Sequence, residues 1–106
     1  MKIHPTITAF VNAKNDRNSS AVVTCFADDA VVHDEGQESR GLVAIKEWSD
    51  KSFRKYQFII EPTDIAEEGD KTVLTATLTG TFPGSPLSLD FNFTMQGDKI
   101  VALLID

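Results

Sequence analysis

The feature that most constrains the fold is a change of hydrophobic period near Tyr56. From there to the C-terminus apolar and polar side chains alternate, and turn residues interrupt the alternation at 68–70, 83–86 and 96–98. Such alternation predicts strands. The predicted strands cover about residues 56–67, 70–81, 87–96 and 99–105. Because short turns join consecutive strands antiparallel, we expect a four-stranded meander.

The first half of the chain has a helical period instead. A helix is predicted from Pro5 to about Lys14, and a second short one from about Ser20 to Asp28. A brief strand, Ala30–Asp34, and a glycine-containing loop over 35–41 follow. Apolar spacings of three and four residues then predict a third helix that begins at Leu42 and runs for about thirteen residues.

These elements define an α+β domain with three helices packed on one face of a strongly curved, mostly antiparallel sheet. A chain of 106 residues forms one hydrophobic core. It contains no internal repeat, low-complexity tract or linker. We therefore expect a single domain over residues 1–106.

Composition excludes several classes of function. A net charge of −6 disfavours nucleic acids and anionic membranes as partners. No apolar run reaches the length of a membrane helix, and residues 1–5 lack a signal-peptide core, so a cytoplasmic location is expected. Cys25 is the only cysteine and is expected in the core. The acidic residues near His33 fit a helix end and a loop, so no metal or cofactor is expected.

The last predicted strand is apolar on both sides. Ile100, Ala102 and Leu104 alternate with a second apolar set, Val101, Leu103 and Ile105. Such a strand is typical of one buried on both faces, yet one helical layer can cover only one face. We therefore expect a homodimer through the sheet, the alternative being a twisted central strand in a monomer.

Three segments carry a family resemblance. The stretch Phe26-Ala27-Asp28-Asp29-Ala30-Val31-Val32-His33-Asp34 and the Arg40-Gly41 helix entry, together with the closing Gly97–Ile100 hairpin and the order of elements, resemble the NTF2-like (cystatin-like) superfamily. Within it the chain is similar to the SnoaL-like and ketosteroid-isomerase-like branch. This resemblance implies a cone of helices and bent sheet around an apolar pocket, usually in a dimer. It leaves function open, because the branch includes isomerases, cyclases, dehydratases, epoxide hydrolases and proteins without known chemistry.

The resemblance can be carried to single residues. Ketosteroid isomerases use an Asp general base with a Tyr and a protonated Asp that stabilise the enolate. Asp34 falls on the position of the base, whereas Phe10, which has no hydroxyl, falls on that of the Tyr. Asp90 matches the second acid without gaps, but alternation favours Leu89 on the inner face and Asp90 on the outer. Ketosteroid isomerase chemistry is therefore not expected.

Histidine and aromatic side chains complete the candidate site. His33 neighbours Asp34 in a strand and should point the other way, unless a bulge turns it inward as an acid or base. Aromatic residues either line the pocket or fill the core. The candidate binding residues are Phe10, Phe26, His33, Trp48, Tyr56, Phe82, Leu89 and Phe91.

Two functions follow from these residues. The first is a pocket protein that binds a small apolar molecule without ketosteroid isomerase chemistry. The alternative is a small acid/base enzyme of the isomerase, cyclase, dehydratase or epoxide hydrolase type. There Asp34 would be the general base for an apolar carbonyl or polyketide-like substrate.

Overall fold

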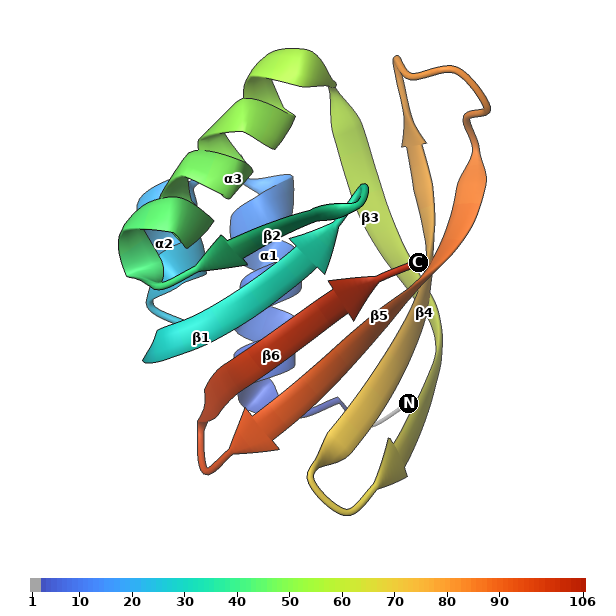
Figure 1. Ribbon diagram of the computed structural model, residues 1–106. Coiled ribbons are helices and arrows are strands. Elements are labelled where there is room, and N and C mark those ends of the chain that lie inside the picture. The colour runs from blue at the N-terminus through green and yellow to red at the C-terminus, as the bar shows by residue number, and fades with distance from the viewer. Residues whose placement is uncertain (1–2) are drawn as a thin grey trace.

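Three helices lie on one face of a six-stranded sheet (Figure 1). The computed structural model describes residues 3–106. Its elements are α1 (Pro5–Asn15), α2 (Ser19–Val23), β1 (Phe26–Asp34), β2 (Gln37–Arg40), α3 (Leu42–Lys55), β3 (Phe58–Glu68), β4 (Lys71–Gly80), β5 (Leu87–Gln96) and β6 (Lys99–Ile105). Across these residues no helix is long and apolar enough to span a bilayer.

The sheet has the strand order β2-β1-β6-β5-β4-β3. The four strands from β3 to β6 form the predicted antiparallel meander, and β1 adds to β6 in parallel. This arrangement confirms the α+β class and the predicted strands of the second half, whose ends differ by at most two residues from those observed. The meander therefore follows the local hydrophobic period closely.

The predicted helix over residues 20–28 is wrong in its second half. Helix α2 ends at Val23, and β1 begins at Phe26, which pairs with Ile100 of β6. The Ile100 backbone N–H also donates a hydrogen bond to the Cys25 carbonyl oxygen at 2.9 Å. Pairing with β6 therefore ends the helix before Phe26. Because β6 is far away in the sequence, the local hydrophobic pattern does not indicate this pairing.

The predicted loop over residues 35–41 instead contains the turn and the second strand of a hairpin with β1. Its residues Gln37–Arg40 form β2, which pairs antiparallel with β1. Glu35 and Gly36 form the turn with φ values of 52° and 74°, and two positive φ values are typical of a type I′ hairpin turn. A short polar edge strand carries no hydrophobic alternation, so sequence patterning does not detect it.

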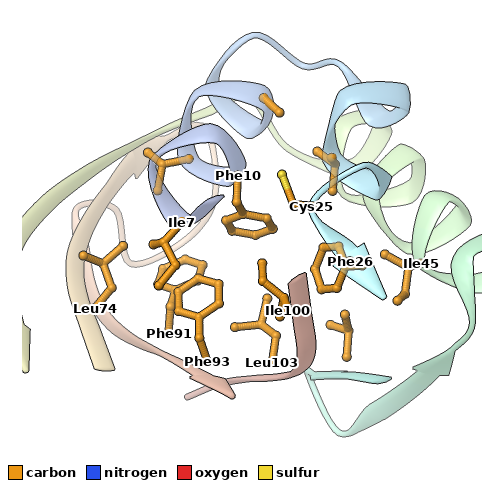
Figure 2. Packing of buried hydrophobic residues seen from close by; sticks show 14 of the residues in the cluster. Ile7, Phe10, Cys25, Phe26, Ile45, Leu74, Phe91, Phe93, Ile100 and Leu103 are labelled. Atoms are coloured by element: carbon orange, nitrogen blue, oxygen red, sulfur yellow. The ribbon is translucent and has the colours of Figure 1, made fainter. Parts of the chain in front are cut away.

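The hydrophobic core centres on Phe10 of α1, which is fully buried (Figure 2). Its ring meets three other rings edge-on, at centroid distances of 5.9 Å to Phe26, 6.3 Å to Phe91 and 5.5 Å to Phe93. Figure 2 shows the Cys25 sulfur above the same ring. The ring of Phe10 therefore fills the space between α1 and the sheet.

The C-terminal end of α1 is tied to two other elements. The Asn15 amide nitrogen donates to the Ile60 carbonyl at 2.9 Å, and its oxygen accepts from the Ile60 N–H at 2.7 Å, on the edge strand β3. The Arg17 guanidinium donates to the carbonyls of Phe53 and Tyr56 at the end of α3. Carbonyls at a helix C-terminus lack intrahelical donors, so these bonds satisfy them.

Strand β6 departs from the strict alternation expected for it. Its pairing with β5 shifts register, so Ile100 and Leu103 both lie on the inner face and are fully buried. Ala102 is half-buried, and Leu104 faces outward with 46% of its surface exposed. The strict alternation expected along this strand is therefore wrong, whereas the homodimer through the outer face stays a prediction.

Replacing Leu104 by glutamate tests that dimer. A charge at an apolar position of a dimer interface is desolvated without a partner, so the Leu104→Glu dimer should dissociate. Analytical ultracentrifugation at tens of micromolar should show a dimer for the wild type and a monomer for Leu104→Glu. The matched control is Val43→Glu, on the helical layer, where the native side chain is 85% exposed; it should remain dimeric. A monomeric wild type would contradict the prediction.

Candidate functional site

A cavity of about 520 Å³ lies between α3, the end of α1 and the inner face of the sheet. Its volume is within the range of small-molecule sites. Most of its wall is apolar and comes from β3, β4 and β5, with Phe58, Ile60, Leu78, Leu89 and Phe91. Four polar side chains interrupt this wall: Lys14, Asp34, Glu35 and Ser52.

Asp34 is the last residue of β1 and faces the cavity. Its inward direction follows from strand alternation, because Val32 is fully buried on the same face. The Trp48 indole N–H donates a hydrogen bond of 3.0 Å to Asp34 Oδ2. Burial raises the pKa of Asp34 above its ordinary value, and the Trp48 hydrogen bond offsets part of that rise. The result is a desolvated carboxyl group held in one orientation.

Lys14 provides a buried ammonium group on the same cavity. Its residue is only 3% exposed, and Nζ donates a hydrogen bond of 2.9 Å to Ser52 Oγ. Nζ also lies 4.2 Å from the centre of the Trp48 ring and 4.6 Å from that of Phe53, which are cation–π distances. Burial lowers the pKa of Lys14 to about 7, although the Asp34 carboxylate opposes this shift.

Trp48 contacts both ionisable groups. Its indole N–H bonds to Asp34, and its ring face packs against the Lys14 ammonium. Among residues 3–106 the structure contains no direct ion pair between Lys14 and Asp34. The side chain of Trp48 therefore bridges a carboxyl group and an ammonium group on one cavity wall, and each of these groups shifts the pKa of the other without a direct ion pair.

Six of the predicted site residues line the cavity. They are Asp34, Trp48, Tyr56, Phe82, Leu89 and Phe91. At the rim the rings of Tyr56 and Phe82 meet edge-on at 5.8 Å. Asp90 lies on the outer face, where the Thr75 hydroxyl donates to its Oδ1 at 2.8 Å. The carboxyl group of Asp90 is therefore remote from the cavity.

Three predicted binding residues lie elsewhere. Phe10 and Phe26 do not line the cavity, because both rings are buried in the core between α1 and the sheet. His33 points to the outer face, as strand alternation predicts, so no bulge turns it toward the cavity. On the outer face its Nε2 lies 3.8 Å from Glu38 Oε1, and 46% of the His33 side chain is exposed.

Sequence reasoning missed Lys14 as a site residue, although a signal was present. Ile7, Phe10, Val11 and Lys14 recur at helical spacing, so Lys14 continues an apolar stripe of α1. A charged residue on a buried stripe needs a partner or a function. Phe58, Ile60 and Leu78 were predicted to lie in strands, but which strand residues face a cavity depends on the tertiary structure.

Cys25 and the acidic residues of β1 lie outside the cavity. Cys25 is 4% exposed at the junction of α2 and β1, and burial raises the pKa of its thiol, which disfavours a nucleophilic role. Asp28 and Asp29 are both exposed. Over residues 3–106 no three His, Cys, Asp or Glu side chains are grouped as a metal site would require.

A family model of the SnoaL-like domain matches residues 7–103. The chain belongs to the SnoaL-like domain family. A candidate polyketide cyclase from Sinorhizobium meliloti has the same fold with a TM-score of 0.94 and 33% identity, over 98% of this chain and 95% of that one. Among curated proteins none matches the chain.

More distant structures show the same fold. A protein with a ketosteroid isomerase-like fold from Catenulispora acidiphila has a TM-score of 0.89 at 20% identity, covering 99% of this SnoaL-like chain and 86% of its own. A cystatin-fold protein from Novosphingobium aromaticivorans has a TM-score of 0.81 at 21% identity, covering 100% and 98%. The predicted NTF2-like, cystatin-like fold is thereby confirmed.

The buried Lys14 should make the stability of this SnoaL-like domain depend on pH. Above about pH 7 the folded state has released the Lys14 proton, while the unfolded state keeps it until about 10.5. The unfolded state then binds more protons, so stability rises with pH across this window. Relative to Lys14→Met, the wild type should gain about 2 kcal/mol of unfolding free energy between about pH 7 and about pH 9.

Urea unfolding at the two pH values measures this gain. Lys51→Met is the matched control, because Lys51 is an exposed lysine on α3; its pH dependence should equal that of the wild type. Parallel pH profiles for the wild type and Lys14→Met would show that Lys14 is not desolvated in the folded state.

Proposed function

We propose that this chain binds a small, largely apolar carbonyl compound in the cavity and that Asp34 removes and returns a proton on it. The observation that carries the proposal is the desolvated Asp34 carboxyl group, held by Trp48 on an apolar wall. Burial raises the pKa of Asp34 and so makes its carboxylate a stronger base. Such a base can remove the acidic hydrogen on the carbon next to a ketone carbonyl.

The proposed chemistry differs from that of ketosteroid isomerases. Phe10 has no hydroxyl and is buried in the core, and Asp90 lies on the outer face. Deprotonation next to a carbonyl is also the first step of an aldol cyclisation. The similarity to a candidate polyketide cyclase from S. meliloti supports a substrate with several carbonyl groups.

A non-catalytic pocket is the second candidate. Asp34 Oδ2 already accepts the Trp48 N–H, and this bond alone would explain a buried carboxyl group that orients an aromatic wall. In that case the cavity would bind an apolar molecule without changing it. The two candidates differ in whether Asp34 is needed for turnover or only for the shape of the cavity.

Hydrogen exchange into a ketone separates the two candidates. The probe is β-tetralone, an apolar bicyclic ketone with acidic α-hydrogens, incubated in heavy water and followed by NMR. The wild type should accelerate α-hydrogen exchange, and Asp34→Asn should slow the enzymatic rate by roughly 10²- to 10⁴-fold, the usual contribution of a general base.

The matched control is Asp90→Asn on the outer face, which should exchange at the wild-type rate. Binding can be followed in parallel by tryptophan fluorescence, because Trp48 is the only tryptophan and lines the cavity. Binding of β-tetralone without faster exchange, or equal exchange by the wild type and Asp34→Asn, would reject the enzyme and favour the non-catalytic pocket.

A further inference from the structure

Lys14 lies one helical turn beyond Phe10, on the same stripe of α1. The side chain at position 10 packs in the core, whereas that at position 14 reaches the cavity wall. This difference follows from the place of Lys14 in the last turn of α1, beside the Asn15 bonds to β3. Phe10 has no hydrogen-bond donor to offer a ligand, but Lys14, one turn further along α1, has one.

The Lys14 ammonium retains donor capacity. It has three N–H groups, and within residues 3–106 one hydrogen bond, to Ser52 Oγ, is observed. The Ser52 hydroxyl itself donates to the Ser49 carbonyl at 2.7 Å, which leaves its lone pairs to Lys14. The rings of Trp48 and Phe58, 4.2 and 5.5 Å from Nζ, provide π faces but no oxygen acceptor.

The positions of the charges match the needs of an enolisation. A base must reach the hydrogen on carbon while a positive donor meets the neighbouring oxygen, and the two must not quench each other. Trp48 contacts Asp34 through its N–H and Lys14 through its ring, and among residues 3–106 these two groups form no ion pair with each other. The other charged groups near Lys14 are Arg17, at the end of α1, and Glu35, which lines the same cavity.

We propose that Lys14 is the oxyanion-binding residue of this cavity and that it holds the carbonyl oxygen of an enolisable ketone. The Asp34 carboxylate takes the α-hydrogen as a proton, the C–H electron pair forms the carbon–carbon double bond, and the carbonyl oxygen becomes an enolate. The Lys14 ammonium donates a hydrogen bond to this oxygen and keeps its own proton. Protonated Asp34 then returns the proton to carbon. This inference rests on the proposed function.

Burial supports the assignment. A charged donor in a water-poor site stabilises a developing oxyanion more strongly than it would in water. The pKa of Lys14 is lowered to about 7, chiefly by desolvation, and an anionic ligand oxygen beside Nζ would restore the charged form. Ligand binding should therefore increase the protonation of Lys14.

The experiment compares two planar probes of almost equal shape. β-Naphthol carries an oxygen whose ionised form imitates the enolate of β-tetralone, and naphthalene lacks it. Isothermal titration calorimetry on the full chain should show that the wild type binds β-naphthol more tightly than naphthalene. Lys14→Met should lose roughly 10- to 100-fold of β-naphthol affinity, the usual range for a charge-assisted hydrogen bond. It should retain naphthalene binding.

Absorbance gives a second readout that a purely structural lysine would not affect. β-Naphthol bound to the wild type should ionise at lower pH than free β-naphthol, because the ammonium stabilises the naphtholate. With Lys14→Met this shift should vanish. Lys14→Gln, which keeps a donor for Ser52 but no charge, should also lack the shift, so it replaces Lys14→Met if that variant does not fold.

Four outcomes overturn the inference. Equal affinity of the wild type for the two probes rejects Lys14 as the oxygen donor but leaves the Asp34 proposal intact. The same holds if Lys14→Met keeps the wild-type preference. A covalent adduct at Lys14 after β-tetralone and borohydride would identify the amine as a nucleophile instead. Failure of the wild type to bind either probe rejects both proposals. Equal α-hydrogen exchange by the wild type and Asp34→Asn rejects the proposed function, and with it the enolate step, but not the binding of a ligand oxygen by Lys14, which the two probes measure.

Discussion

The cavity of this molecule depends on the last turn of α1, which joins α1 to β3 and to the end of α3. Asn15 pairs with both backbone groups of Ile60 on the edge strand β3, and Arg17 donates to the terminal carbonyls of α3. Three elements are thereby held together through backbone groups that would otherwise lack partners. Lys14 directly precedes Asn15 in this turn, and its side chain lines the cavity. The same turn that joins the elements thus also places the ammonium.

Helix α1 divides the interior into a packed core and a cavity. At Phe10 four aromatic rings interlock, and the space is filled. One turn later the stripe continues with a lysine, whose burial is costly unless the charge is paired or used. A buried ammonium and a half-buried carboxyl group on one wall are poor choices for stability alone, and such local conflicts are typical of functional sites.

Trp48 relates folding to chemistry in three ways. Its position on the apolar stripe of α3 directs it inward, its N–H orients Asp34, and its ring face receives Lys14. Because one rigid ring contacts both ionisable groups, their separation is set by packing rather than by flexible side chains. The cavity is therefore a region of fixed charges on an apolar wall, an arrangement suited to stabilising charge that develops on a bound ligand.

Local period alone determined the meander, the helix α3 and the inward direction of Leu89, because each depends on residues two to four positions apart. The choice of Asp34 as the candidate base came from the resemblance to ketosteroid isomerases. The strand that begins at Phe26 depends on pairing with β6, which is too distant in sequence to leave a local signal. The hairpin strand Gln37–Arg40 depends on pairing with β1, and its polar sequence shows no hydrophobic alternation. The same holds for the site. Sequence placed Asp34 and Trp48 on inward faces, but only the packed structure showed that Phe10 belongs to the core and Lys14 to the cavity. Both residues lie on one helical stripe, and the boundary between filled and open space along that stripe is a property of everything that packs against it.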